Sequence, residues 1–333
     1  MAKVARVVRF HEFGGPEVLK LDEVEVRAPL AGEVRISVKA LGLNRAECLF
    51  REGKYLERPK DLPCVLGYEA SGVIESLGEG VTQFKVGDKV STIPAFPMSK
   101  YGVYGELAVV PASAVAHFPE NLTFEQAASI WMQYLTAYGA LVQYSRIVAG
   151  DYVLITAASS SVGYAAIELC VAKGVTSIAT TRTAQKRKQL LDAGASHVIV
   201  TDDEDLVERV QEITNKHGAD VIFDCVAGPF LKKLAEAAAV NGVIYEYGVL
   251  SLTDTPFPMF QALNKGLSVR GYSMFEVTSK PEKLERARNY IMNGLQNGTL
   301  KPLIDKTFPL DKIAEAHRYM ESNQQNGKIV VTV

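Results

Sequence analysis

The sequence predicts an α/β protein in which a β-rich part is followed by a doubly wound parallel sheet. Three observations predict this fold. The first third of the chain consists of short β-like runs separated by Gly and Pro, and the chain from Tyr152 onward alternates strand-like with helix-like segments. The length of 333 residues suits about two domains. A hydrophobic fraction of 47% and a charged fraction of 22% are ordinary for a globular chain with a sizeable core.

Composition excludes several classes of partner. The formal net charge is −2 and the acidic and basic residues are interspersed, so we expect no nucleic-acid partner and no attraction to an anionic membrane. No apolar run approaches the roughly 20 residues of a membrane span. The N-terminus enters a strand-like alternation at once, which predicts no signal peptide. Four scattered cysteines without a Cys-x-x-Cys pair favour reduced thiols in a cytoplasmic protein: Cys48, Cys64, Cys170 and Cys225.

Short alternating runs define the β-rich part. We expect strands at 34–38, 72–78 and 106–110, because polar and apolar residues alternate there between turn residues. A helix is expected from Thr123 to Leu141, and Thr123 with Gln126 forms a candidate capping box at its start.

From Tyr152 to Arg270, strand-like and helix-like segments alternate. Six short strands with helical crossovers imply a doubly wound parallel sheet. The expected strands are 153–156, 177–180, 197–200, 221–224, 242–245 and 267–270, and the expected helices are 162–173, 184–193, 205–217, 230–240 and one near Phe260.

The first strand of this series leads into a turn of small residues and then a helix. Such a turn places backbone N–H groups and the positive end of the helix dipole against a dinucleotide pyrophosphate. An ordinary strand–turn–helix connection is the alternative, and the surrounding series of strands and helices favours the dinucleotide site. The expected cofactor residues here are Ser159, Ser160, Ser161, Val162 and Gly163.

The end of the second strand favours NADPH over NADH. An NAD site wants a carboxylate there for the ribose 2′-hydroxyl, but this chain has Thr181 and Arg182, with no acid until Asp192. Arg182 and Lys186 are donors suited to a 2′-phosphate. A solvated basic start to the following helix is the alternative interpretation.

Three segments carry a family resemblance. Residues 42–47, 66–69 and 130–138 are similar to the zinc-ligand segments of zinc alcohol dehydrogenases, with Asn44, Tyr68 and Met132 at the ligand positions. Further landmarks are Phe13-Gly14-Gly15-Pro16-Glu17-Val18-Leu19 and Gly327-Lys328-Ile329-Val330-Val331. Over its whole length the chain resembles the medium-chain dehydrogenase/reductases, and most of all their zinc-free quinone oxidoreductase and enoyl reductase branch.

The resemblance implies a division of the chain and a dimer. It implies a GroES-like catalytic domain from residues 1–124 and 270–333, a Rossmann cofactor domain from 125–269, and a homodimer joined through edge strands. No metal is expected, because Asn and Tyr do not favour zinc and Met sulfur is a weak neutral ligand. The further cofactor residues that it implies are Asn44, Cys225, Gly248, Val249, Ser273, Phe275 and Lys328.

A catalytic pocket without a Lewis acid favours reduction of an activated C=C bond, because hydrogen-bond donors suffice to stabilise an enolate. The resemblance implies Tyr55 as the donor, with Asn44 and Tyr68 beside it; the alternatives are a surface-loop Tyr55 and a Tyr68 that only fills the metal void. Glu69 is expected to be structural, and the five histidines are expected at the surface or at strand ends. Trp131, Met132, Met259 and Phe260 would make the pocket apolar.

The leading hypothesis is a zinc-independent, NADPH-dependent reductase that transfers hydride to small hydrophobic quinones or α,β-unsaturated carbonyls. Three alternatives stay open. They are an enoyl-thioester reductase, a zinc-free carbonyl/alcohol oxidoreductase, and a cofactor-binding protein with a structural or partner role.

Overall fold

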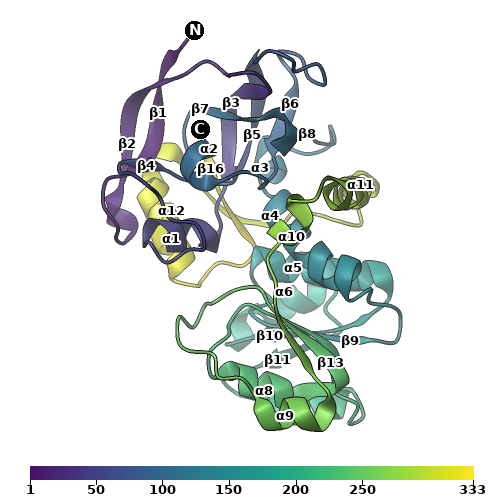
Figure 1. The fold of residues 1–333 in the computed structure, drawn as a ribbon. Coiled ribbons are helices and arrows are strands. Elements are labelled where there is room, and N and C mark those ends of the chain that lie inside the picture. The colour runs from purple at the N-terminus through teal and green to yellow at the C-terminus, as the bar shows by residue number, and fades with distance from the viewer. The chain divides into compact units, whose positions relative to one another are not determined.

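The computed structural model describes all of residues 1–333, and these form two compact units (Figure 1). Unit 1 contains Met1–Met132 and Pro302–Val333, and unit 2 contains Gln133–Lys301. The boundaries thus lie after Met132 and before Pro302, whereas boundaries near residues 124 and 270 were expected. Residues 271–301 stay with unit 2 because side chains tie them to it. The Tyr272 hydroxyl, for example, donates to the Leu135 carbonyl.

Unit 1 is built on a seven-stranded sheet with β3 (Glu33–Gly42) near its centre. The order is β15-β16-β3-β5-β6-β8, and β7 also pairs with β3. A second sheet has the order β2-β1-β4. The three expected strands of this region are confirmed as β3, β5 and β7, although residue 78 lies outside β5 and residue 106 outside β7. The strands of unit 1 besides β3 are β1 (Lys3–Phe10), β2 (Leu19–Val26), β4 (Cys64–Val65), β5 (Glu69–Leu77), β6 (Lys89–Thr92), β7 (Leu107–Pro111), β8 (Val115–His117), β15 (Ile304–Pro309) and β16 (Lys328–Thr332).

Two small helices of unit 1 matter for the site. Helix α1 (Arg45–Arg51) begins directly after β3, and Asn44 is its N-cap. Helix α12 (Ile313–Glu321) precedes the last strand. A third helix, α2, spans Met98–Tyr101.

The expected helix 123–141 is divided. Its capping box is confirmed, since the Thr123 side chain accepts from the Gln126 N–H and the Gln126 side chain reaches back to Thr123. However, α3 (Phe124–Ala127) stops after one turn, and α4 (Trp131–Tyr138) begins after three intervening residues and continues as a π-helical turn, Gly139–Tyr144. The prediction of one continuous helix over residues 123–141 was therefore wrong. The break places Glu69 against the first turn of α4, where it accepts from the Met132 N–H.

Unit 2 is the expected doubly wound parallel sheet, with strand order β11-β10-β9-β12-β13-β14. Its strands are β9 (Tyr152–Ile155), β10 (Thr176–Thr181), β11 (His197–Val200), β12 (Ala219–Asp224), β13 (Ala238–Glu246) and β14 (Ser268–Gly271). Its helices are α5 (Ser161–Lys173), α6 (Arg187–Asp192), α7 (Leu206–Ile213), α8 (Phe230–Ala237), α9 (Met259–Lys265), α10 (Phe275–Thr278) and α11 (Pro281–Asn297). The expected helix 230–240 was too long, because α8 ends at Ala237 and β13 begins at Ala238.

One core cluster holds the helices of unit 2 to its sheet. It joins strand residues such as Leu154, Ile222 and Ile244 to Leu206 of α7 and Leu234 of α8, all nearly or fully buried. The consecutive residues Val153, Leu154 and Ile155 are all buried, so both faces of this strand are covered and it appears in the sequence as a continuous apolar run.

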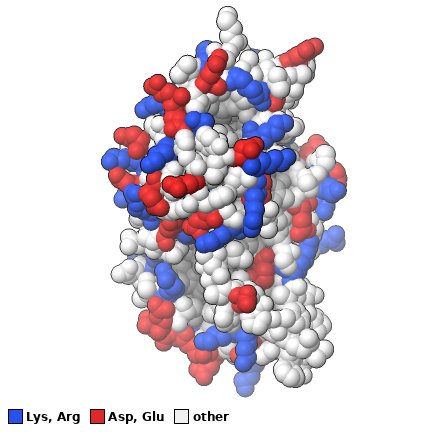
Figure 2. Space-filling view, turned by 60° about the vertical axis from the view of Figure 1, so that its left-hand side comes forward, with Lys and Arg blue, Asp and Glu red and all other residues white.

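The structure contains no helix that is both long and apolar enough to cross a membrane. Acidic and basic side chains are mixed over the face shown in Figure 2, in keeping with the small net charge. This face therefore offers no extended basic surface of the kind that binds nucleic acid.

Candidate active site

The turn between β9 and α5 has the features of a pyrophosphate site. Ser160 is the N-cap of α5, and its hydroxyl accepts from the Gly163 N–H at 3.1 Å. Gly163 is required because an added Cβ would lie 2.3 Å from the Ala158 carbonyl oxygen. Other N–H groups of the first helical turn lack intrahelical acceptors, so the turn offers backbone donors to an anion.

A second element of the same site comes from the end of β10. Thr181 is buried, Arg182 after it is exposed, and Lys186 lies one turn further along. The Lys186 ammonium donates to the Ser159 hydroxyl at 3.3 Å. The structure thus brings Ser159 and Lys186, which were predicted from separate segments, into direct contact.

The carboxyl ends of β12, β13 and β14 carry the other expected cofactor residues. Cys225 is buried, and burial raises the pKa of its thiol to about 12, so it stays protonated. Gly248 lies against it, since an added Cβ would come 2.8 Å from the Cys225 Cβ. Ser273 accepts from the Phe275 N–H at 3.3 Å, and Val249 is exposed.

Sequence reasoning missed Glu246, the last residue of β13. Its register partner on β12 is Asp224, which also accepts from the Ala227 N–H at 2.7 Å. Burial, with the Asp224 carboxylate as the next cause, raises the pKa of Glu246 to about 9. A carboxylic acid at the end of a buried parallel strand was the available signal, because carboxyl groups are rarely buried without a partner or a role.

In unit 1, two buried carboxylates tether the three positions that match zinc ligands. Glu47 accepts from the Asn44 N–H at 2.6 Å and from the Tyr68 N–H at 3.2 Å. Glu69 accepts from the Met132 N–H at 2.9 Å. The structure therefore brings the three predicted segments together around Glu47 and Glu69. Glu69 thus links β5 to the first turn of α4.

Lys328 was expected at the cofactor and lies in this cluster. Its side chain is fully buried, and its ammonium is 2.6 Å from the Asn44 Oδ1 and 2.5 Å from a Glu69 carboxylate oxygen. The Asn44 amide nitrogen in turn donates to the Gly42 carbonyl at 3.3 Å and to Glu47 at 3.2 Å. An amide oxygen can accept more than one hydrogen bond, so the Asn44 Oδ1 can also accept from a ligand.

Tyr55 and Tyr68 form an aromatic pair. Their ring centroids are 6.4 Å apart in an edge-on arrangement, and Phe96 lies 5.9 Å beyond Tyr68. Burial raises the pKa of Tyr55 to about 12, and a hydrogen bond with Tyr68 opposes this rise. The same bond adds to the burial that raises the pKa of Tyr68. Both phenols are therefore neutral hydrogen-bond donors over the ordinary pH range, and Tyr55 is the more exposed of the two.

The residues at these positions do not fit a zinc ion. Zinc sites use thiolate, imidazole and carboxylate ligands. Here the side chains are an amide whose oxygen already accepts from an ammonium, a phenol held neutral, and a thioether. A zinc dication at this place would also be repelled by the ammonium of Lys328.

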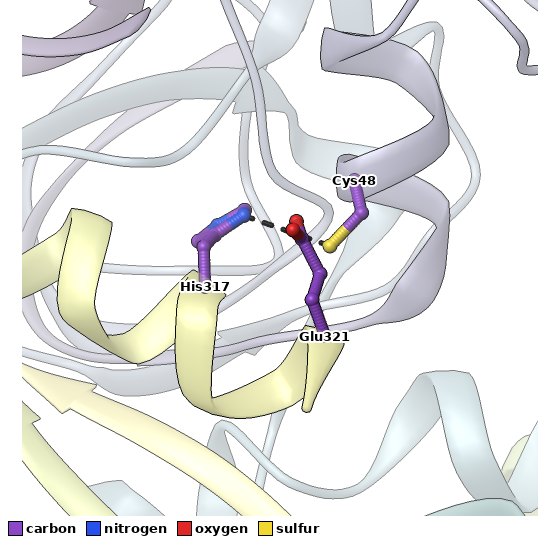
Figure 3. A group of neighbouring side chains, drawn as sticks. All are labelled: Cys48, His317 and Glu321. Carbon is purple, nitrogen blue, oxygen red and sulfur yellow. Dashed lines mark hydrogen bonds between the residues drawn. The ribbon is translucent and has the colours of Figure 1, made fainter. Parts of the chain in front are cut away.

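A further group of potential ligands lies elsewhere in unit 1 (Figure 3). Cys48, His317 and Glu321 converge there, with the Cys48 Sγ 3.7 Å from the His317 Nδ1. The buried Arg51 already serves as their cation, because its guanidinium lies 3.0 Å from the His317 Nδ1 and 2.6 Å from Glu321. Burial, followed by Arg51, lowers the pKa of His317 to about 3. The prediction of a surface or strand-end position was wrong for His317.

The expected apolar pocket residues do not form one group. Trp131 is fully buried, and its indole N–H donates to the Ser91 hydroxyl at 2.9 Å, so it belongs to the core of unit 1. Met132 is also nearly buried, whereas Met259 and Phe260 of α9 are exposed.

The Arg45 guanidinium donates hydrogen bonds to the Met320 carbonyl and to the Asn323 side chain.

Two known protein families match parts of this chain. Residues 30–120 match the alcohol dehydrogenase GroES-like domain family and residues 193–331 match the zinc-binding dehydrogenase family. The human quinone oxidoreductase is 32% identical over 334 residues, covering 99% of this chain and 98% of that protein. A 2-haloacrylate reductase from Burkholderia sp is 30% identical over 328 residues, covering 96% and 97%.

Among solved structures, the Escherichia coli quinone oxidoreductase complexed with NADPH matches with a TM-score of 0.89. It is 30% identical and covers 98% of this chain and 100% of its own. Both the sequence likeness and the fold likeness extend over nearly the whole chain. The chain belongs to the medium-chain dehydrogenase/reductase superfamily, in its quinone oxidoreductase branch.

Proposed function

We propose that this protein is a zinc-independent, NADPH-dependent oxidoreductase that transfers hydride to the activated double bond of a quinone or an α,β-unsaturated carbonyl. The observation that carries the proposal is the set of side chains at the three metal-ligand positions. Asn44, Tyr68 and Met132 supply hydrogen-bonding and apolar groups, and Glu47, Glu69 and Lys328 tie them into the fold.

The proposed cofactor site lies in unit 2. Backbone N–H groups at Ser161 and Val162 would receive the pyrophosphate, while Lys186, Ser159 and Arg182 would receive the 2′-phosphate. The Escherichia coli relative solved with NADPH supports this assignment. Bound NADPH would supply the hydride.

Tyr55 is the proposed donor to the substrate oxygen. Hydride addition at the β-carbon of an enone moves negative charge to the carbonyl oxygen, and a neutral phenol can donate a hydrogen bond there. Its hydrogen bond with Tyr68, which favours the anionic form of Tyr55, would make the phenol a better proton donor to the enolate. Asn44 is proposed to accept from the cofactor through its Oδ1.

The acceptor class has support from a second relative. The likeness to a 2-haloacrylate reductase favours a C=C bond conjugated to a carbonyl or carboxyl group over a simple aldehyde. Reduction of such a bond places charge on an oxygen, where the Tyr55 phenol suffices without a metal.

We also propose a cytoplasmic homodimer. β14 ends the sheet of unit 2 and has no neighbour on its outer side, so its backbone groups can pair with a second copy. Exposed apolar residues precede it: Val249, Leu250, Leu252, Phe257, Met259, Phe260 and Leu263. Sedimentation analysis tests this, with a monomer as the contrary result. The four free, buried cysteines suit a reducing compartment.

The direct test is NADPH consumption with four acceptors: a quinone, a simple enone, an enoyl thioester and an aldehyde. We expect turnover with the quinone or the enone and little with the aldehyde. Preference for the enoyl thioester would favour the enoyl reductase alternative. Tight NADPH binding without consumption of any acceptor would instead indicate a cofactor-binding protein.

A further inference from the structure

Three neighbouring strands of unit 1 place a lysine in the middle of the candidate site. β16 runs antiparallel to β3 with Val330 opposite Gly42, and the Leu43 N–H donates to the Ile329 carbonyl. The same register continues beyond the end of β3 and puts Lys328 opposite Asn44. β5 lies on the other side of β3, with Glu69 opposite Gly42. The sheet register itself therefore aligns Lys328, Asn44 and Glu69.

The backbone leaves room for the lysine only because residue 42 is glycine. An added Cβ there would lie 2.9 Å from the Lys328 Cε and 1.9 Å from the Ala128 carbonyl oxygen. The Lys328 side chain thus passes beside Gly42 in a fully enclosed path. A lysine buried to this degree normally requires a charged partner, and Glu69 is that partner.

Lys328 also decides which way the Asn44 amide faces. An ammonium has only donors, so the atom of Asn44 next to it must be the carbonyl oxygen. With Oδ1 held at 2.6 Å from the ammonium, the amide nitrogen is directed to Gly42 and Glu47. A flipped amide would place its NH₂ group against the ammonium and lose these bonds.

The charges around the lysine are unevenly matched. Two carboxylates, Glu47 and Glu69, face a single ammonium, and burial raises the pKa of Glu47 to about 7 against the lowering effect of Lys328. The other titratable groups that face Glu47 are the neutral phenols of Tyr55, Tyr68 and Tyr104. Without the lysine, both carboxylates would lack a compensating charge.

We infer that Lys328 is a positioning residue for the proposed reaction, which holds the Asn44 amide with its Oδ1 as the acceptor and its nitrogen on Gly42 and Glu47, and which balances the charge of Glu69. The inference rests on the proposed function for the role of Asn44. The orientation of the amide is a property of the free protein, however, and can be measured without turnover.

The test compares wild type with a Lys328→Met/Glu69→Gln double variant. Lys328→Met alone would leave a buried carboxylate uncompensated and risks misfolding, whereas the double variant removes both charges together. The amide oxygen introduced by Glu69→Gln can still accept from the Met132 N–H. The matched control is Arg35→Met/Glu75→Gln, which removes another ion pair of unit 1, 2.5 Å long, away from Asn44.

The first readout is the side-chain amide NMR signal of Asn44, identified by its loss in Asn44→Ala. We expect one well-defined pair of resonances in wild type and in the control, and shifted or exchange-broadened resonances in Lys328→Met/Glu69→Gln. An unchanged signal in that folded variant would overturn the inference, whatever the wild type does with NADPH.

The second readout is a double-mutant cycle on single-turnover hydride transfer to a quinone. We expect the loss of Lys328 and Glu69 to slow transfer by roughly tenfold or more, and by less than about twofold when Asn44→Ala is already present. Fully additive losses would contradict a positioning role. A wild type that binds NADPH but transfers no hydride would count against the proposed function, while the NMR result would still decide the role of Lys328.

Discussion

The ammonium of Lys186 lies 3.3 Å from the hydroxyl of Ser159, which joins the segment after β10 to the turn between β9 and α5. An adenosine 2′-phosphate bound beside this contact would meet both groups. We therefore predict that Lys186→Ala lowers the preference for NADPH over NADH by about 10-fold to 100-fold, the value of one hydrogen bond to a charged group.

The measurement is the ratio of the two dissociation constants. Lys188→Ala is the matched control, because Lys188 is highly exposed and pairs only with Asp192. An equal loss of affinity for NADH and NADPH in Lys186→Ala would show that the lysine does not read the 2′-phosphate.

Tyr55→Phe tests the donor in unit 1. Removing a hydrogen bond to a developing oxyanion costs roughly 100-fold in rate, so kcat with a quinone should fall by about that factor while NADPH affinity stays the same. Tyr101→Phe is the control, since Tyr101 belongs to the same aromatic group but donates to Glu33. Wild-type turnover by Tyr55→Phe would remove Tyr55 from the mechanism.

Gly163→Ala tests the turn that precedes α5. The added methyl group would lie 2.3 Å from the Ala158 carbonyl oxygen, and this overpacking should cost about 1–3 kcal/mol in stability and weaken NADPH binding. Gly271→Ala is the control, because no atom lies within 4 Å of its added Cβ. Thermal unfolding with and without NADPH gives both quantities. Unchanged binding by Gly163→Ala would argue against a pyrophosphate at this turn.

Glu246 gives a pH-dependent prediction for stability. Its pKa is raised by burial and by Asp224 from an ordinary value of 4.5 to about 9 in the folded state. Below the unfolded pKa, Glu246 is neutral in both states and the protein keeps its full stability. As pH rises toward the folded pKa, the unfolded state loses the proton while the folded state retains it, so the free energy of unfolding falls. Glu246→Gln, which cannot ionise, should therefore be more stable than wild type at pH 8 and similar at pH 4.

We expect the gain at pH 8 to be about 1–2 kcal/mol, well below the full linkage value, because the Glu246 side chain is partly exposed. Urea unfolding at the two pH values measures it. Glu208→Gln is the control for the substitution itself, because Glu208 lies at an exposed position of α7. A gain that is the same at both pH values for Glu246→Gln would contradict the raised pKa.

Local patterns were sufficient to predict unit 2. Several of its strands contain short apolar runs, such as Val153–Ile155 and Val221–Phe223, which are typical of a parallel sheet covered on both faces. The capping box at Thr123 was also visible, because both of its partners lie within one turn. The break after α3 was not visible, since it depends on Glu69 reaching the Met132 N–H across 63 positions of sequence.

The long-range parts of the site were beyond local reasoning. Lys328 and Asn44 are separated by 284 positions, and only the sheet register brings them together. His317 is a different case. It shares the buried face of α12 with Ile313, Ala316 and Met320, and this helical spacing was present in the sequence. A histidine on an apolar helical face was the signal for a buried position.

The proposed hydride transfer needs no metal. The most direct measurement combines metal analysis of the purified protein with NADPH oxidation by a quinone, before and after treatment with a strong chelator. We expect turnover that the chelator leaves unchanged, with zinc far below one ion per chain. Stoichiometric zinc whose removal abolishes turnover would contradict it.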